Sequence, residues 1–404
     1  MRYPAAVLLM LIALVPVVPA HAVVAEGIYY LQGVTSGLHL AQTGNSVVLH
    51  RPEGDLDHQQ WWVRGERIEN TDSPGSCLNR SLTITPCTTD GTAWEFVAAG
   101  DQWDIPGLAT GGETRWYLTP ISSPRLPMPA DPTLDQVTFL TAHNAFANGV
   151  DGDFAAPILN IARNQTRGIT RQLADGVRGF MIDIHETPQG AMLCHGGCDW
   201  VPHPVALRTD LQRIVDFLAA HPSEIVTVFL QDGVSAPVLG AELARVQGLQ
   251  SVLFRPDQAG VRENGWPTLS AMRASGRRLL LFTDRYPPDG RDSYGVMYQR
   301  EWTVENYWSM GGPIGSADWA CYTRWDERPL TATGTFQPLF VMNHFRDIPF
   351  PITIYNDNGK IARRAEQFCQ PAARKKPSYL AVDMYELSKA SAAVATLNTY
   401  TYRP

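Results

Sequence analysis

The chain lacks an excess of basic residues. Its 404 residues carry 33 lysines and arginines against 40 aspartates and glutamates, which gives a formal net charge of −7. An acidic chain is poorly suited to the phosphate backbone of nucleic acid, so we exclude a nucleic-acid partner. The sequence also lacks the cluster of basic residues that would hold a protein firmly on an anionic bilayer. We therefore expect any contact with a membrane surface to be transient.

Long apolar runs are also missing, apart from one near the N-terminus. Ala5 to Val18 follows Arg2, and Ala20-His21-Ala22 then supplies the small residues of a cleavage site. This pattern predicts a secretory signal peptide over residues 1–22. A membrane anchor is the weaker interpretation, because the run is short for a bilayer. We therefore expect a secreted, extracellular protein.

Cysteine is scarce, and the six cysteines all follow the predicted signal peptide. An even number in an exported chain favours disulfides. Proximity in the sequence suggests the pairs Cys77–Cys87, Cys194–Cys198 and Cys321–Cys369, although other connectivities stay open. A metal site at Cys194 and Cys198 is an alternative that we rank lower, because no second pair of closely spaced cysteines accompanies it.

Residues 24–118 predict an all-β domain. Short strand-like segments, turns and aromatic residues recur in the same order in two passes, followed by a partial third. The ends of the two passes, Gln60-x-Trp62 and Ala93-Trp-Glu-Phe96, resemble the Q-x-W repeat of ricin-type β-trefoil lectins. That resemblance implies a partial β-trefoil and a glycan partner. We expect the repeated tryptophans to fill the core rather than to stack on a sugar.

Residues 119–133 are rich in proline and predict a stiff, extended linker. From residue 134 to residue 404, apolar runs alternate with helical patterns, of which Leu207 to Ala220 is the clearest amphipathic helix. Strand-like runs alternating with helices over about 270 residues predict an α/β fold, a distorted TIM (β/α)8 barrel.

Polar side chains stand where these apolar runs end. The endings are His143-Asn144, Asp183, His195, Gln231-Asp232, Asp284, Asn343-His344 and Asp383. In a parallel barrel the carboxyl ends of the strands meet at one rim, so we expect these side chains to share a site. Two histidines that face one scissile bond suit general acid–base catalysis. Cleavage of a phosphodiester also needs positive charge on the phosphoryl oxygens, from arginine or a metal.

Six sequence motifs follow one another between residues 140 and 385. The motifs are Leu140 to Ala147, Gly176 to Asp183, Leu193 to His195, Pro222 to Val226, Gly265 to Thr268 and Ala381 to Tyr385. Together they resemble the phosphatidylinositol-specific phospholipase C (PI-PLC) X-domain superfamily over about residues 134–400. The resemblance implies a distorted TIM barrel and an enzyme that cleaves a phosphoinositide or a related phospholipid.

The resemblance also implies roles for individual residues. His143 resembles the general base that deprotonates the inositol 2-hydroxyl, and His195 resembles the general acid that protonates the departing diacylglycerol oxygen. A 1,2-cyclic inositol phosphate would be the product. Asp383 ends the last predicted strand, where a carboxylate can orient a histidine as the acid of a catalytic triad does.

The source of positive charge stays open at this point. Metal-independent relatives carry an arginine two residues after an aspartate on the second strand, whereas this chain has Met181 and then Asp183. Calcium-dependent relatives use an asparagine after the first histidine, and this chain keeps Asn144. Because asparagine and carboxylate oxygens suit Ca²⁺, we predict a weak calcium site at Asn144 and Asp183, with Asp232 or Glu186 assisting.

Two other basic side chains are candidates for binding the phosphate. His185 is an alternative cation for the phosphate. An ordinary loop contact at the end of the strand is an equally supported interpretation of this residue. Arg178 begins its strand, so we expect it to anchor the barrel floor through an ion pair. The tryptophans Trp200, Trp302, Trp308 and Trp319 form either a rim that dips into a membrane or a cover over the barrel.

Two other functions compete with the phosphodiesterase. A barrel that has lost activity, with the β domain as a carbohydrate- or surface-binding part, is favoured by Met181 and Gln231; the retention of both His143 and His195 favours the enzyme. A glycerophosphodiesterase on the same fold is less well supported, because its His-Arg-Gly opening and its Glu-Asn pair are absent.

Overall fold

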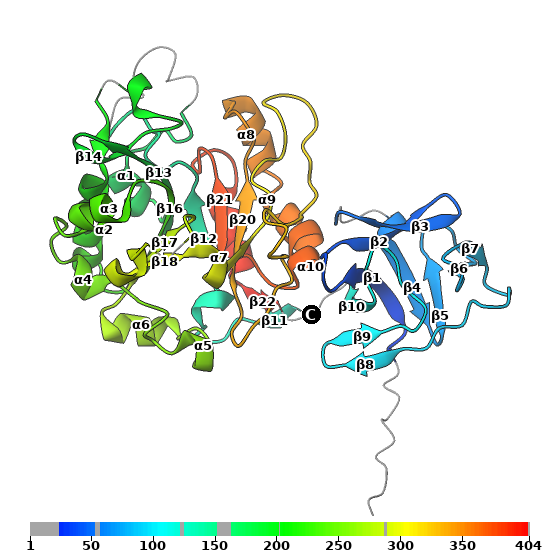
Figure 1. The fold of residues 1–404 in the computed structure, drawn as a ribbon. Coiled ribbons are helices and arrows are strands. Elements are labelled where there is room, and N and C mark those ends of the chain that lie inside the picture. Colours follow the sequence, from blue (N-terminus) through cyan, green and yellow to red (C-terminus); the bar gives the residue numbers. More distant parts are fainter. Residues whose placement is uncertain are drawn as a thin grey trace, which may run out of the picture.

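The structure is a computed structural model that describes residues 24–52, 57–121, 125–151, 163–201, 203–286 and 289–402. The predicted signal peptide lies outside these residues. Among the described helices, none combines the length and the apolar character needed to cross a bilayer. Figure 1 shows an all-β unit at the N-terminal side and an α/β unit beside it.

The all-β unit is one antiparallel sheet system. Its central ladder pairs β1 (Gly27–Gly33) with both β4 (Gln60–Arg64) and β10 (Arg115–Pro120). The remaining strands are β2 (His39–Thr43), β3 (Ser46–His50), β5 (Arg67–Asn70), β6 (Ser76–Leu78), β7 (Ile84–Pro86), β8 (Val97–Ala99) and β9 (Gln102–Asp104). The prediction of an all-β domain is therefore confirmed.

Three tryptophans form the core of this unit in the same way. Trp61, Trp94 and Trp116 are buried. Each indole Nε1 donates to a leucine carbonyl earlier in its own repeat, at 2.8 Å to Leu40, 2.8 Å to Leu78 and 3.1 Å to Leu108. These tryptophans thus fill the core as expected, and the third repeat carries the same contact as the first two. The β-trefoil assignment and a bound glycan stay predictions.

Eight parallel strands form the barrel. Their order in space is β18 (Val296–Tyr298), β17 (Leu279–Thr283), β16 (Val226–Gly233), β13 (Gly179–Thr187), β12 (Phe139–Ala142), β21 (Tyr379–Val382), β20 (Leu339–His344) and β19 (Thr303–Glu305). Within the described residues, β18 and β19 share no ladder, and only the single turn of α7 (Gln299–Trp302) joins them. The barrel is therefore open along one seam, which is the distortion that the sequence predicted in general terms.

Helices cover the outside of the sheet (Figure 1). The predicted amphipathic helix is α2 (Leu207–Ala220), whose Leu207, Leu211, Ile214 and Leu218 are buried. The other helices are α1 (Ile169–Ala174), α3 (Ala236–Leu243), α4 (Leu249–Val252), α5 (Val261–Asn264), α6 (Leu269–Ser275), α8 (Pro351–Asn358), α9 (Ile361–Arg364), α10 (Gln370–Ala373) and α11 (Ala390–Leu397). A hairpin strand, β14 (Gly190–Leu193), runs antiparallel to β13, and β15 (Val205–Ala206) pairs with it.

The two units contact one another directly. The linker contributes β11 (Arg125–Pro127), which pairs with the C-terminal strand β22 (Tyr400–Tyr402). Gln32 Nε2 donates to the carbonyl of Ala372 at 2.6 Å, and Arg374 Nη1 donates to Thr119 Oγ1 at 2.7 Å.

All three predicted disulfides are present, so the metal interpretation of Cys194 and Cys198 is wrong.

Candidate active site

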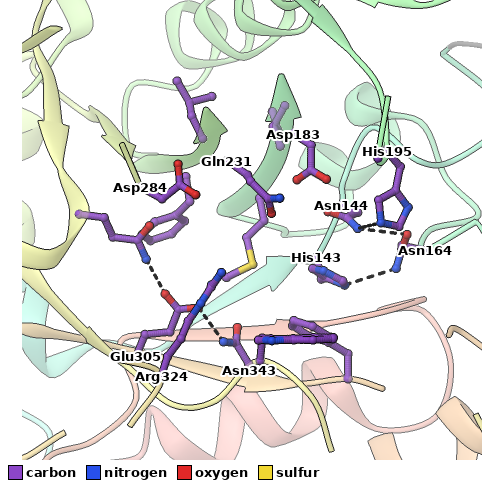
Figure 2. A pocket seen from close by; sticks show the side chains of 18 of the residues that line it. His143, Asn144, Asn164, Asp183, His195, Gln231, Asp284, Glu305, Arg324 and Asn343 are labelled. Atoms are coloured by element: carbon purple, nitrogen blue, oxygen red, sulfur yellow. Dashed lines mark hydrogen bonds and ion pairs between the residues drawn. The ribbon is translucent and has the colours of Figure 1, made fainter. Parts of the chain in front are cut away.

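A pocket of about 400 Å³ lies at the carboxyl ends of the barrel strands. Figure 2 shows the two histidines on one side of it and an acidic and amide-rich group on the other. Of the predicted polar strand endings, seven residues line this pocket: His143, Asn144, Asp183, His195, Gln231, Asp284 and Asn343. The convergence expected of a parallel barrel is therefore present at these positions.

His143 and Asp383 form a buried pair. Nδ1 of His143 lies 2.8 Å from Oδ1 of Asp383, whose side chain is only 1% exposed. Asn164 Nδ2 donates to the same carboxylate oxygen at 2.9 Å. Because the carboxylate can only accept, the His143 Nδ1 carries the proton in this arrangement and Nε2 is left to accept a proton from the pocket.

Phe345 fixes the plane of the His143 ring. The two rings are stacked with centroids 3.5 Å apart and an interplanar angle of 5°. Gln165 Nε2 donates to the carbonyls of His143 and Val382, at 2.8 and 2.9 Å, and so ties the ends of β12 and β21 together. The sequence analysis missed Asn164 and Gln165, which follow no strand pattern, and Phe345, an apolar residue directly after the predicted ending Asn343-His344.

His195 reaches the pocket from the loop after β14, and the disulfide between Cys194 and Cys198 closes that loop. Asn144 Nδ2 lies 3.4 Å from Nε2 of His195 and donates to Asn164 Oδ1 at 3.3 Å. Asn144 has a φ of 44°, in the left-handed region that asparagine tolerates better than most residues. Burial and the nearby His143 lower the pKa of His195.

Asp183 lies on β13 and is buried in the pocket wall. Burial raises the pKa of its carboxyl to about 7, against the opposing influence of His143. Asp284, from the loop after β17, shares the pocket, and burial raises its pKa as well. The pocket thus holds two carboxyl groups that favour the neutral form more than exposed aspartates do.

The predicted calcium ligands do not come together. Asp232 is buried against Arg291, whose Nε lies 2.7 Å from Oδ2, and Thr283 Oγ1 also donates to that oxygen at 3.0 Å. Its neighbour Gln231 lines the pocket instead. The reason is that successive side chains of a strand point to opposite faces.

Glu186 accepts a hydrogen bond from the backbone N of Ser235 at 2.7 Å and does not line the pocket. The described residues contain no group of three or more His, Cys, Asp or Glu side chains placed to hold a metal ion. Asn144 and Asp183 line the pocket, but Asp232 and Glu186 do not, so the predicted set of ligands is not assembled. Calcium dependence itself stays a prediction.

Arg324 is a cation that the sequence analysis missed. It lines the pocket, and its Nη1 donates to Oε1 of the buried Glu305 at 2.6 Å. Glu305, and to a smaller extent Asp284 and Asp183, raise the pKa of Arg324 and keep it charged. Glu305 also accepts from Asn343 Nδ2 at 2.7 Å. No spacing pattern marks Arg324, because it lies in a loop that carries no strand signal.

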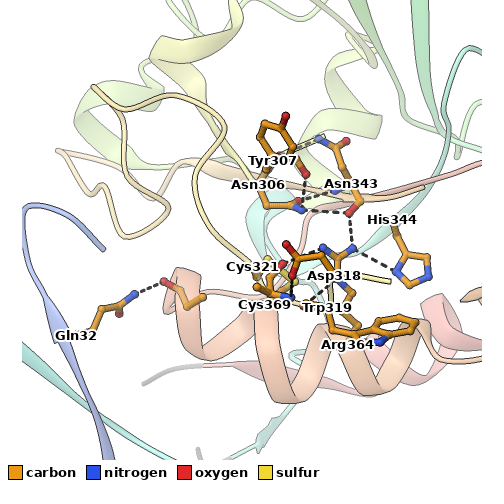
Figure 3. The surroundings of a disulfide bond; sticks show 12 residues. Gln32, Asn306, Tyr307, Asp318, Trp319, Cys321, Asn343, His344, Arg364 and Cys369 are labelled. Atoms are coloured by element: carbon orange, nitrogen blue, oxygen red, sulfur yellow. Dashed lines mark hydrogen bonds between the residues drawn. A yellow bond between two sulfur atoms is a disulfide. The ribbon is translucent and has the colours of Figure 1, made fainter. Parts of the chain in front are cut away.

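The loop that carries Arg324 is attached to the barrel near the disulfide between Cys321 and Cys369 (Figure 3). Arg364 is buried there, and its guanidinium donates to the carbonyls of Trp319 at 3.2 Å, Ala320 at 3.2 Å and Asn343 at 2.7 Å. Arg364 therefore joins the loop to the end of β20. Arg178, by contrast, forms the predicted floor ion pair, with its Nε 2.7 Å from Glu224 Oε2.

Residues 132–398 match the PI-PLC X domain family (PI-PLC X 1). The chain belongs to the PI-PLC X domain family. A PI-PLC X domain-containing protein of Arabidopsis thaliana is 30% identical over 261 residues, which is 62% of this chain and 58% of that protein. An uncharacterized secreted protein of Arthroderma benhamiae is 24% identical over 294 residues, 66% of this chain and 61% of that protein.

This PI-PLC X chain therefore matches less than two thirds of the length of either relative. Among solved structures, a phosphatidylinositol-specific phospholipase C of Staphylococcus aureus is similar with a TM-score of 0.43 and 14% identity, over 66% of this chain and 93% of that chain. The enzyme of Listeria monocytogenes has the same TM-score and identity, over 67% of this chain and 95% of that chain.

Proposed function

We propose that the protein is a secreted phosphodiesterase that cleaves a phosphoinositide or a related phospholipid by two-histidine acid–base catalysis. The observation that carries the proposal is the shared pocket of His143 and His195, with Asp383 hydrogen-bonded to the first histidine at 2.8 Å. Membership of the PI-PLC X domain family supports the same reaction class.

In the first half of the reaction, His143 acts as the base. Its Nδ1 proton is held by Asp383, so Nε2 takes the proton of the inositol 2-hydroxyl while that oxygen attacks phosphorus. The stacking of Phe345 on the ring keeps Nε2 aimed at the pocket. The Asp383 carboxylate also stabilises the imidazolium that forms.

In the second half, His195 acts as the acid. The bond between phosphorus and the diacylglycerol oxygen breaks, and the proton on His195 passes to that oxygen. A 1,2-cyclic inositol phosphate and diacylglycerol are the products. Burial favours neutral His195 in the free protein, but a bound phosphodiester brings a negative charge that favours its protonated form.

Arg324 supplies the positive charge for the phosphoryl oxygens. Its guanidinium group donates a hydrogen bond to Glu305, so its charge is oriented before the substrate binds. This arrangement gives the pocket a cation without calcium. Two further polar groups of the pocket, the half-buried Asp284 and the exposed Gln231, are suited to accept hydrogen bonds from the hydroxyls of a polyol head group.

Export from the cell is part of the proposal. The three disulfides are typical of an oxidising compartment. A relative in Arthroderma benhamiae is named a secreted protein. The predicted signal peptide agrees with both observations.

The test is hydrolysis of phosphatidylinositol vesicles by the wild type, His143→Ala and His195→Ala, each with calcium and with chelator. Cleavage that both substitutions abolish supports the proposal, and cleavage that survives the chelator supports Arg324 as the cation. Folded wild-type protein that cleaves nothing would favour the inactive barrel, and glycan binding by residues 24–118 would then be measured on a glycan array.

A further inference from the structure

The loop between β19 and β20 carries Arg324 to the pocket, and both units contact this loop. From the barrel, Arg364 and a disulfide hold its middle part (Figure 3). From the all-β unit, Arg51 and Pro52 reach the same part of the loop, directly after β3. The stretch from residue 318 to residue 321 therefore lies where the two units meet.

A main-chain hydrogen bond joins the two units at this stretch. The backbone N of Cys321 donates to the carbonyl of Pro52 at 3.0 Å. Cys321 and Pro52 are both buried, and a buried N–H group that lost its acceptor would destabilise the loop. The all-β unit thus completes the hydrogen bonding of a loop that belongs to the barrel, three residues before Arg324.

The side chain of Arg51 contacts the loop on both sides of that hydrogen bond. Its Nη1 lies 3.4 Å from Oδ2 of Asp318, and its guanidinium carbon lies 4.4 Å from the centroid of the Tyr322 ring. The other carboxylate oxygen of Asp318 accepts from the backbone N of Ala320 at 3.0 Å. Arg364 of the barrel also interacts with the charge of Asp318 (Figure 3). Asp318 therefore links one cation of each unit.

Tyr322 connects these contacts to Arg324. Its ring stacks on that of Tyr307 with centroids 5.2 Å apart, and the backbone N of Tyr307 donates to the carbonyl of Tyr322 at 2.8 Å. The backbone N of Arg324 donates to the carbonyl of Glu305 at 2.9 Å. Tyr322 and Arg324 are thus attached to one short segment at the end of β19, so a displacement of Tyr322 should displace Arg324.

We propose that the all-β unit is a positioning element of the active site, which acts by holding the loop so that Arg324 faces the phosphate. This inference rests on the proposed function, because Arg324 is given its role by the phosphodiester. Arg51 is a positioning residue in this arrangement, since it does not line the pocket and acts through Tyr322 and Asp318. The all-β unit then serves catalysis directly, in addition to any glycan that it binds.

The exposure of the Arg51 pair separates positioning from stability. The side chains of Arg51 and Asp318 are 50% and 41% exposed, and ion pairs as exposed as this contribute little to the free energy of unfolding. Arg51→Ala should therefore unfold at the wild-type temperature. Its kcat should fall by about fivefold and its KM change by less than about twofold, because an oriented cation acts on the transition state.

The experiment measures steady-state kinetics on phosphatidylinositol with the full chain, for the wild type and Arg51→Ala. Arg115→Ala is the matched control, because Arg115 is an exposed arginine that pairs with Asp104 inside the all-β unit, at 3.6 Å. It should leave kcat unchanged. Both substitutions are also made in Arg324→Ala protein, where Arg51→Ala should lower kcat by less than about twofold further, because the group that it positions is gone.

Hydrogen exchange of residues 318–325 is measured in parallel on the same proteins without substrate. Arg51→Ala should speed exchange in this stretch by about fivefold, and Arg115→Ala should not. An unchanged kcat in Arg51→Ala would overturn the inference, as would an equal loss of kcat with and without Arg324. If the wild type cleaves nothing, faster exchange in Arg51→Ala supports the hold on the loop and overturns the proposed function alone. Unchanged exchange in that case overturns both.

Discussion

His143 and Asp383 are 240 residues apart in the sequence, yet their side chains meet at 2.8 Å. The pairing of β12 with β21 brings them together, because Ala142 lies in register with Val382 and each is followed by one of the two residues. The backbone N of His143 donates to the carbonyl of Val382 at 3.0 Å. The pair therefore lies one residue beyond the ladder, at the carboxyl ends of two central strands of the sheet.

Replacing Asp383 with asparagine should lower kcat by about 10²–10⁴-fold. An amide can donate to Nδ1 of His143 and so stabilise the tautomer in which Nε2 cannot act as a base. Asp216→Asn, at an exposed position of α2, is the control. Steady-state kinetics on phosphatidylinositol and a thermal unfolding curve check both variants. Unchanged kcat in folded Asp383→Asn protein would rule out this orienting role.

Replacing Arg324 with alanine should lower kcat by about 10²–10³-fold, because the phosphoryl charge loses its oriented cation. Arg324→Lys should retain part of the activity, since it keeps the charge but not the planar fork. Arg300→Ala removes a nearby arginine that pairs with Glu327 outside the pocket, and it should stay active. If Arg324→Ala and Arg324→Lys lower kcat equally and leave KM unaffected, the reaction depends on the geometry of the guanidinium group and not on the charge alone.

The pH dependence should report His195. Because burial and His143 lower its pKa below the ordinary value of 6.5, the general acid loses its proton as the pH rises through a value under 6.5. The kcat/KM of the free enzyme should therefore fall on the alkaline side of that value. Titration of the His195 ring protons by NMR should show the low pKa, and His143→Gln should raise the pKa of His195, because His143 is one of the groups that lower it. A pKa at or above 6.5 in the wild type would contradict this assignment.

Removing the disulfide between Cys321 and Cys369 with two serines should cost about 2–4 kcal/mol of stability, because it closes a long loop. The separation is 48 residues, against 10 for Cys77–Cys87. Activity should fall as well, since the loop carries Arg324 to the pocket. Removing Cys77–Cys87 is the control, which should destabilise the all-β unit and leave kcat unchanged. Chemical unfolding and kinetics on both double variants distinguish the two effects.

Much of the barrel could be predicted because its signals are local. An apolar run that alternates with helices marks a parallel strand, and the polar residue at its end then falls at the rim. His143, Asp183 and Asp383 were found in this way, and His195 by the short strand before it. The six cysteines paired as their spacing suggested.

Asp232 was predicted to face the pocket, but it pairs with Arg291 instead. Local sequence signals do not determine which face of a strand a residue occupies. Gln231 and Asp232 are neighbours on β16, and neighbouring side chains point to opposite faces of a strand. The register pairs Asp183 with Gln231, so Gln231 shares the pocket face and Asp232 faces Arg291. The sequence identified the strand end but not which of its two residues points inward.

The sequence by itself determined the two units, six of the eight parallel strands of the barrel and the two histidines, because each depends on residues close together in the chain. It did not identify the short strands β18 and β19. Only the tertiary structure decided the rest of the site. Asn164, Arg324 and Phe345 lie in loops, and the positions of loop residues depend on distant contacts such as those of Glu305 and Arg364. Long-range packing therefore determined the position of Arg324 and the orientation of the His143 ring, which no local pattern encodes.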